Sequence, residues 1–358
     1  MEWKEDVLGS VLEVKYGKDH KKLADGQYPV YGSGGLMRYV DSKLYDGPSI
    51  LIPRKGTLNN IMFVESPFWT VDTMFWSIIN TDKVDPKFLF YSICKRDFAS
   101  MNVGSAVPSM TVNILNDIQI SYPKNIEDQR RIASILSSLD RKIELNSKIN
   151  ADLEEMAQAI FKNWFVDFEP FKGGKFVDSE LGMIPEGWKV GCLGDIAEIT
   201  SGKRPPKKSK DKTKELFIPL IGASDIMGFT SDVLYERPIL VIGRVGTHGV
   251  VQRFQEKCWP SDNTLVIESS YYNYVYQLLK GIDYSAINRG STQPLITQTD
   301  VKNTDVIIAP ENVLKEYESI TSTLFSKHRA NIKENSRLSL LRDTLLPRLM
   351  SGELEVPE

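Results

Sequence analysis

The sequence predicts an α+β fold in which two α/β domains are separated by a long antiparallel two-helix coiled coil, with an internal repeat of pseudo-two-fold symmetry. Two observations lead to this prediction. Motifs from the first third of the chain recur in the same order about 185 residues later, and each copy is followed by a long segment with heptad spacing of apolar residues. A chain of 358 residues is long enough for two or three domains.

The composition is that of an ordinary globular protein, 41% hydrophobic and 25% charged. A net charge of −3 neither identifies nor excludes a nucleic-acid-binding protein, because a basic patch can coexist with acidic helices. Cys94, Cys192 and Cys258 are unclustered, which argues against disulfides and a zinc site and favours a reduced, cytoplasmic setting. We expect neither a signal peptide nor a membrane span, because no apolar run reaches roughly 18 residues.

The repeat is defined by short motifs that keep their order. Trp3-Lys4 and Leu8-Gly9 reappear as Trp188-Lys189 and Leu193-Gly194, and Gly17-Lys18 reappears as Gly202-Lys203. Three further pairs are Arg54-x-Gly56-Thr57 with Arg244-x-Gly246-Thr247, Trp69 to Thr73 with Trp259 to Thr264, and Gly104-Ser105-x-x-Pro108 with Gly290-Ser291-x-x-Pro294. The offsets drift by a few residues, as loop insertions would produce.

The first domain spans residues 1–122. Residues 49–53 and 61–65 are predicted to be strands on either side of a basic turn. Residues 86–100 have helical spacing with proline in the first turn, and residues 118–122 close the domain as a strand.

A long helix follows at residues 123–168. Its apolar residues form a heptad seam: Ile132, Leu136, Leu139, Ile143, Leu153, Ala157, Ile160 and Trp164. At ~1.5 Å per residue, a helix of roughly 40 residues is about 60 Å long. Its apolar seam needs a partner helix along that length. A connector at residues 169–187 leads to the second domain.

The second domain spans residues 188–310 and contains a shorter helix near residues 271–280. The second long helix, within residues 311–358, supplies the partner. A shift of 185 residues places Leu139, Leu153, Ile160 and Trp164 of the first seam on Leu324, Leu338, Leu345 and Leu349 of the second.

Both seams are interrupted by asparagines near their centres, Asn146 and Asn150 in the first and Asn331 and Asn335 in the second. In an antiparallel pair the centres meet, so these asparagines would face one another. A buried asparagine is costly unless its amide is paired, and it is a known device for fixing helix register. The alternative is that they lie on a wetter flank of the seam and contribute little.

Two inverted copies at the ends of a helix pair suit a two-part target on a linear polymer such as duplex DNA. Three groups of residues add a resemblance over essentially the whole chain. These are the domain openings at Trp3 and Trp188, the connector residues 164–170 and 184–188, and the C-terminal run 341–354. Together they resemble the specificity subunit of a type I restriction–modification system.

The resemblance implies two target-recognition domains, each binding one half of a split double-stranded DNA sequence, with conserved helices that set the gap between the halves. It also implies two methylation subunits that use S-adenosylmethionine, and restriction subunits that use ATP and Mg²⁺. The chain itself is expected to bind no cofactor. An alternative is the recognition subunit of another methylation-linked phage-defence complex, and a third possibility is a coiled-coil scaffold with no DNA role.

No catalytic constellation is apparent. Gly-Lys never precedes Ser or Thr as a phosphate-binding loop requires, and the only Pro-Pro follows Arg204 rather than the Asn or Asp of an amino-methyltransferase motif. His20, His248 and His328 lack metal-ligand spacing. We therefore predict a non-catalytic binding subunit.

DNA contacts require cations, amides and hydroxyls on loops that can approach closely. The candidates in the first domain are Lys18, Tyr31, Ser33, Arg54, Lys55, Ser105 and Ser109. Those in the second domain are Lys203, Arg204, Lys207, Lys208, Arg244, His248, Arg289, Ser291, Thr292 and Gln293.

Each choice has a structural alternative. The basic run from residue 203 to 214 could be a solvated loop, and Arg54 and Arg244 could hold structural turns through ion pairs. The tyrosines at positions 271, 272, 274 and 276 could stack on bases, but their helical spacing favours a core role for some. Phe161, Trp164 and Phe165 are expected to be exposed and to fit a missing partner.

Overall fold

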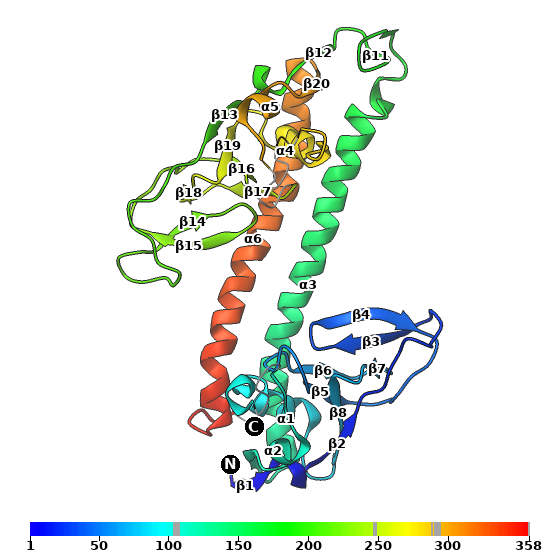
Figure 1. Ribbon diagram of the computed structural model, residues 1–358, viewed down its shortest axis with the longest axis vertical. Helices are drawn as coiled ribbons and strands as arrows, with labels where there is room; N and C mark the ends of the chain where they lie inside the picture. Colours follow the sequence, from blue (N-terminus) through cyan, green and yellow to red (C-terminus); the bar gives the residue numbers. More distant parts are fainter. Residues whose placement is uncertain (103–107, 246–248, 288, 290–294, 357–358) are drawn as a thin grey trace. The chain divides into compact units, whose positions relative to one another are not determined.

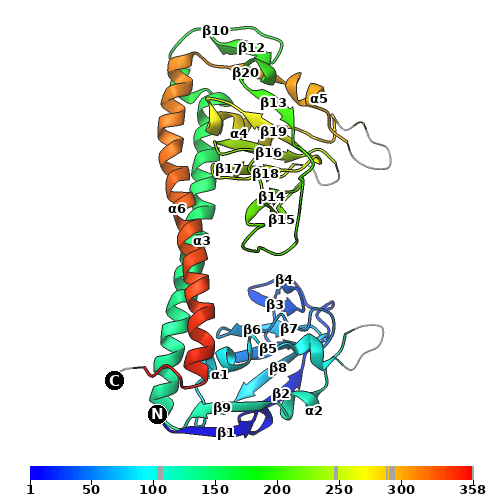
Figure 2. The ribbon, with the colours of Figure 1, turned by 90° about the vertical axis from the view of Figure 1, so that its left-hand side faces the viewer.

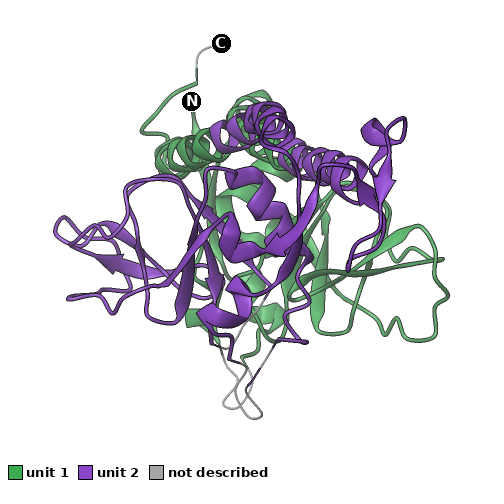
Figure 3. Ribbon diagram, turned by 90° about the horizontal axis from the view of Figure 1, so that it is seen from above, with its two compact units in different colours: residues 1–147, 332–358 green, residues 148–331 purple. Residues whose placement is uncertain are grey.

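The computed structural model describes residues 1–102, 108–245, 249–287, 289 and 295–356. The chain divides into two compact units (Figure 3): unit 1, residues 1–147 and 332–358, and unit 2, residues 148–331. Both divisions fall inside the long helices α3 (Ile126–Phe165) and α6 (Glu311–Met350), so each unit contains a part of each helix.

The described residues of unit 1 form three small sheets (Figure 1). β1 (Trp3–Val7) pairs antiparallel with β9 (Gln119–Pro123). A four-stranded sheet has the order β2 (Leu12–Tyr16), β8 (Met74–Ile79), β5 (Ser49–Pro53) and β6 (Met62–Val64). A three-stranded sheet has the order β4 (Gly35–Val40), β3 (Tyr28–Gly32) and β7 (Trp69–Thr70). Every residue of β5 is buried, as expected of an apolar strand covered on both faces.

Unit 2 repeats this plan. β12 (Lys189–Cys192) pairs antiparallel with β20 (Asp305–Ile308). The four-stranded sheet is β13 (Glu198–Ser201), β19 (Thr264–Glu268), β16 (Ile239–Gly243) and β17 (Val251–Phe254). The three-stranded sheet is β15 (Ile226–Thr230), β14 (Ile218–Ile221) and β18 (Trp259–Pro260), and the connector adds β10 (Phe176–Val177) with β11 (Ile184–Pro185). The internal repeat is therefore confirmed strand by strand.

Short helices accompany the strands in both units. In unit 1, α1 (Pro86–Ile93) is capped by the Asp85 carboxylate, which accepts from Phe88 N, and α2 (Val112–Asn116) is capped by Thr111. The predicted helix over residues 86–100 is wrong beyond Ile93. Asp97 there caps a separate 3₁₀ turn (Phe98–Met101), which turns Phe98 into the core at 0% exposure.

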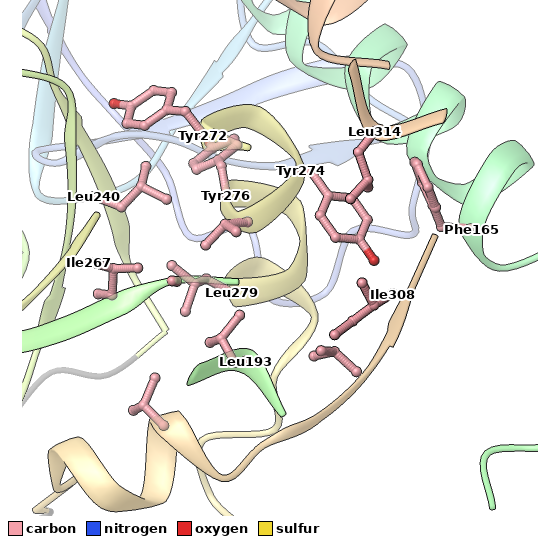
Figure 4. Packing of buried hydrophobic residues seen from close by; sticks show 14 of the residues in the cluster. Phe165, Leu193, Leu240, Ile267, Tyr272, Tyr274, Tyr276, Leu279, Ile308 and Leu314 are labelled. Atoms are coloured by element: carbon pink, nitrogen blue, oxygen red, sulfur yellow. The ribbon is translucent and has the colours of Figure 1, made fainter. Parts of the chain in front are cut away.

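In unit 2 the short helices are α4 (Tyr272–Gly281) and α5 (Gln298–Lys302). Figure 4 shows the core of this unit, where Tyr272, Tyr274 and Tyr276 of α4 pack among Leu240, Ile267 and other apolar side chains. All three tyrosines are buried, so they belong to the core and are not free to stack on bases. Deleting such a large buried ring costs about 3–5 kcal/mol.

The expectation that Phe161, Trp164 and Phe165 are exposed is wrong. Phe165 is 4% exposed and packs on Tyr274 and Tyr317, while Phe161 and Trp164 lie against the same cluster. The short helix α4 closes over this end of α3, which a heptad pattern alone does not reveal.

In each unit the parts of α3 and α6 lie side by side along one side of the strands (Figure 2). In unit 1, Asp140 accepts from Arg342 Nη1 at 2.6 Å, and Asn146 Nδ2 donates to Asn335 Oδ1 at 2.9 Å. As one residue number rises the other falls, so the segments are antiparallel. The antiparallel coiled coil of the predicted fold class is thus observed within unit 1.

Unit 2 shows the same antiparallel pairing. Asn331 Nδ2 donates to Asn150 Oδ1 at 2.9 Å, and the Asn150 amide donates to His328 O at 3.2 Å. Asn150 and Asn331 are 9% and 1% exposed. The four predicted asparagines are therefore paired across the seam within their units, while their role in setting register remains a prediction.

Each domain is anchored to its helix pair by hydrogen bonds from its short helix region. In unit 1, Asp85 N donates to Gln129 Oε1 of α3 at 2.7 Å. In unit 2, Tyr274 N donates to Glu318 Oε1 of α6 at 2.8 Å. In unit 2 the guanidinium of Arg253 in β17 also lies 3.5 Å from the Phe325 ring centroid of α6.

Candidate nucleic-acid interface

In unit 1 the predicted site residues gather around the turn at residues 70–73. Lys18 N donates to Thr70 O at 2.9 Å, and the Trp69 indole Nε1 donates to Lys18 O at 2.9 Å. A Cβ on Gly17 would lie 2.0 Å from Val71 O, so only glycine fits here. The backbone of Lys18 is held from both sides and its side chain is exposed.

The basic turn after β5 joins the same place. Arg54 N and Lys55 N both donate to Thr73 O, at 2.8 and 3.2 Å. The Arg54 guanidinium donates to Asp72 O at 3.2 Å and lies 5.4 Å from the ring centroid of Tyr16. These contacts leave the half-buried guanidinium without a carboxylate partner among the residues the structure describes, so it remains available for an anion or a base.

The hairpin of β3 and β4 completes the unit 1 site. Val71 N donates to Tyr31 O at 3.1 Å, and Asn60 Nδ2 donates to Ser33 O at 2.9 Å. Burial raises the pKa of Tyr31, so its hydroxyl remains a neutral hydrogen-bonding group. Ser109 pairs with Lys55 in an isolated β-bridge. Six of the seven candidates are thus brought together, and Ser105 lies outside the described residues.

Unit 2 builds the same arrangement from its own residues. Lys203 N donates to Pro260 O at 3.0 Å, and the Trp259 indole Nε1 donates to Lys203 O at 2.7 Å. A Cβ on Gly202 would lie 2.1 Å from Ser261 O. We call this arrangement the Gly-Lys clamp. It consists of the Gly-Lys backbone and the Trp indole that donates to it: Gly17, Lys18 and Trp69 in unit 1, and Gly202, Lys203 and Trp259 in unit 2.

The remaining cations of unit 2 lie around the clamp. Arg244 N donates to Asn263 O at 2.9 Å, as Arg54 does to Thr73. A cavity of about 520 Å³ is lined by Arg204, Lys207, Lys208, Met227, Asp262 and other residues. The guanidinium Nε of Arg244 is buried and has no hydrogen-bond partner among the described residues.

Arg289 is a weaker candidate. Its Nε donates to Asp300 Oδ1 at 2.9 Å, so a carboxylate already neutralises it. Asp300 also accepts from Thr297 at the start of α5, which explains the ion pair as part of a helix cap. His248, Ser291, Thr292 and Gln293 lie outside the described residues.

Asp72 and Asp262 are exposed residues that our choice of candidates omitted, although they occupy the centre of both turns. The signal was present in the sequence, because the repeated Trp-x-x-Asp motif places them at matching positions. Within the described ranges, no three His, Cys, Asp or Glu side chains gather closely enough to hold a metal ion. Nor does any helix described here combine the length and apolar character that crossing a bilayer requires.

The family profile of the type I restriction modification DNA specificity domain matches residues 1–155 and 185–337. The chain belongs to this family. It is 31% identical to the MjaIX specificity subunit of Methanocaldococcus jannaschii, over 94% of this chain and 86% of that protein. It is 24% identical to the HindI specificity subunit of Haemophilus influenzae, over 82% of this chain and 83% of that protein.

The fold agrees with this assignment. The crystal structure of a type I restriction–modification S subunit from M. genitalium superposes with a TM-score of 0.69 at 16% identity, covering 98% of this chain and 96% of that one. The protein is a DNA sequence-specificity subunit of a type I restriction–modification system, and its family role is specificity rather than catalysis.

Proposed function

We propose that each unit of this specificity subunit binds one half of a bipartite DNA target. The contacts come from its Gly-Lys clamp and from the adjoining turn that carries Arg54 in unit 1 and Arg244 in unit 2. The observation that supports the proposal most is the duplication of this geometry. Lys18 with Arg54, and Lys203 with Arg244, are held by the same backbone and indole contacts in two segments of otherwise different sequence.

In this arrangement the lysines and the arginines suit two different roles in DNA binding. Lysines on loops neutralise phosphates, which makes binding strongly dependent on salt. Arginines read guanine in the major groove through paired hydrogen bonds. Because the clamp uses backbone groups and an indole rather than the cationic heads, the Lys18 and Lys203 side chains are left exposed for DNA, and the half-buried Arg54 and Arg244 lie beside them.

The partner subunits follow from the same proposal. Two methylation subunits using S-adenosylmethionine, and restriction subunits using ATP and Mg²⁺, would act on the DNA that this chain selects. Exposed apolar side chains on the long helices support a docking role: Leu145, Ile332, Leu340 and Leu341 in unit 1, and Met156 and Ile320 in unit 2. They replace Phe161, Trp164 and Phe165 in this role.

The test is half-site discrimination, with a target first identified by methylation-sensitive sequencing of host DNA. Arg244→Ala should lower discrimination in one half-site by about 5- to 150-fold and leave the other half-site intact. Arg54→Ala should do the reverse. Arg237→Ala is the matched control, because Arg237 is an exposed arginine of unit 2 that pairs with Glu268 outside the clamp.

Two results would contradict the proposal. Equal relaxation of both half-sites by Arg244→Ala would show that one unit does not serve one half-site. Purification of the chain with no methylation subunit, from cells that express both, would contradict the proposed assembly with methylation subunits.

A further inference from the structure

Two exposed methionines occupy equivalent positions in the two units. Met37 of β4 is 56% exposed and Met227 of β15 is 48% exposed. They lie 190 residues apart, which is also the spacing of Arg54 and Arg244. An apolar side chain left in water in both copies of a repeat indicates a contact that the free chain lacks.

Both methionines are placed by the same hairpin geometry. A Cβ on Gly32 would lie 2.6 Å from Met37 Sδ, and a Cβ on Gly222 would lie 3.3 Å from Met227 Cβ. Each hairpin has a register shift just before this glycine, between Val30 and Tyr31 in unit 1 and between Leu220 and Ile221 in unit 2. The methionines are therefore positioned by the backbone.

An amide side chain also fixes each hairpin end. Asn60 Nδ2 donates to Ser33 O at 2.9 Å, and Gln252 Nε2 donates to Gly222 O at 2.8 Å. In unit 2, Met227 lines the same cavity as Arg204 and Lys207. Each exposed methionine thus lies on an element of the site already described.

The chemistry of this setting favours a base over a phosphate as the contact. A thioether cannot pair with phosphate, but it packs well on apolar groups. The major groove admits a two-stranded β-ribbon, and the thymine C5-methyl group is the apolar feature displayed there. The cations beside the hairpin would hold the backbone of the same DNA segment.

We propose that Met37 and Met227 contact thymine C5-methyl groups in the major groove, one methionine in each half-site. The inference rests on the proposed function, because it assumes that each unit binds one half-site. It adds a specificity contact that candidates chosen for their polar groups omit.

The experiment uses the full chain in complex with its methylation subunits and duplexes carrying the target sequence. Each thymine is replaced in turn by deoxyuridine, which removes only the methyl group. In each half-site one replacement should weaken binding about fourfold, the value of one buried methyl-sized group. Met37→Ala should abolish this effect in one half-site, and Met227→Ala should abolish it in the other.

Met183→Ala is the matched control, because Met183 is 54% exposed but lies in the connector. The inference is overturned if no deoxyuridine weakens binding, or if both methionine variants keep the wild-type response. A second measurement uses target duplexes that carry 2-aminopurine, a base whose fluorescence rises when it is unstacked. The inference is also overturned if binding raises this fluorescence and the methionine variants abolish the rise, since the methionines would then be wedges that unstack bases. Equal binding of target and scrambled duplexes would overturn the proposed function itself.

Discussion

Replacing Asn150 by leucine tests whether the asparagine pairs hold the helices in register. Asn150 Oδ1 accepts from the Asn331 amide at 2.9 Å, and both side chains are almost fully buried. The substitution leaves the Asn331 amide without its acceptor in an apolar seam. An unsatisfied buried group of this kind costs about 1–3 kcal/mol.

The double variant Asn150→Leu/Asn331→Leu should behave differently. With both polar groups replaced by apolar ones, the penalty for the orphaned amide disappears, and stability should return to within about 1 kcal/mol of the original chain. Because a unit of this size loses about 2–4 °C per kcal/mol, each single variant should unfold about 2–12 °C lower. The double-mutant cycle would then show strong coupling.

Thermal unfolding measures this first step, and spin-label distances measure register. Replacing all four asparagines by leucine should allow slippage by one heptad, which moves a label on α3 relative to one on α6 by about 10 Å. Labels at Ser138 and Leu341, both exposed and both in unit 1, would report it. Additive single variants, or one sharp distance in the four-leucine chain, would refute the register hypothesis.

Three further outcomes are expected. Burial raises the pKa of Glu318 above its ordinary 4.5, so as the pH rises the carboxyl ionises first in the unfolded chain, and stability falls until the folded pKa is passed. Glu318→Gln should flatten that fall, and an unchanged slope of stability between pH 4 and 8 would contradict the reasoning. Gly202→Ala should lower the free energy of unfolding by about 1–3 kcal/mol, because it forces a Cβ against a backbone carbonyl. Gly34→Ala should be tolerated, because nothing lies within 4 Å of a Cβ there. Equal effects of the two substitutions in denaturant titrations would count against the clamp. Burial raises the pKa of the Cys258 thiol to about 12, so a thiol reagent should label it at pH 8 only after unfolding, and rapid labelling of the native chain would be the contrary result.

The fold was predictable from the sequence because its signals are periodic or duplicated. Strand β5 and helices α3 and α6 were expected close to their observed positions, since heptads and apolar runs have few alternative structures. The end of α1 at Ile93 was not, because it depends on where Phe98 finds space in the core. The burial of Phe165 escaped prediction for the same reason, since only the tertiary packing of α4 covers it.

The site was predictable in part. Residues chosen because they repeat, such as Lys18 with Lys203 and Arg54 with Arg244, lie around equivalent turns. The Trp indole contacts and the exposed methionines were missed, because an apolar residue in a strand pattern is ordinarily assigned to the core. Their exposure becomes visible only when the hairpin is seen to have a free face.

The two clamps share a backbone arrangement, but the segments that continue from them differ in charge. This difference predicts unequal contributions of the two units to the salt dependence of DNA binding. Residues 18–27 have three Lys and two Asp, whereas residues 203–217 have seven Lys or Arg and two acidic residues. The second segment is five residues longer, because the repeat offset grows from 185 at Gly17 to 190 at Tyr28. Each neutralised phosphate contributes about 0.9 to the slope of log K against log salt.

Replacing Arg204, Lys207 and Lys208 together by alanine should therefore reduce the magnitude of that slope by nearly 3. Three exposed lysines elsewhere in unit 2 provide the control: Lys172, Lys175 and Lys189. Filter-binding or anisotropy titrations between 50 and 200 mM salt would measure both variants. An equal slope in the two variants would mean that the basic run is a solvated loop, because cations that touch no phosphate release no counterions.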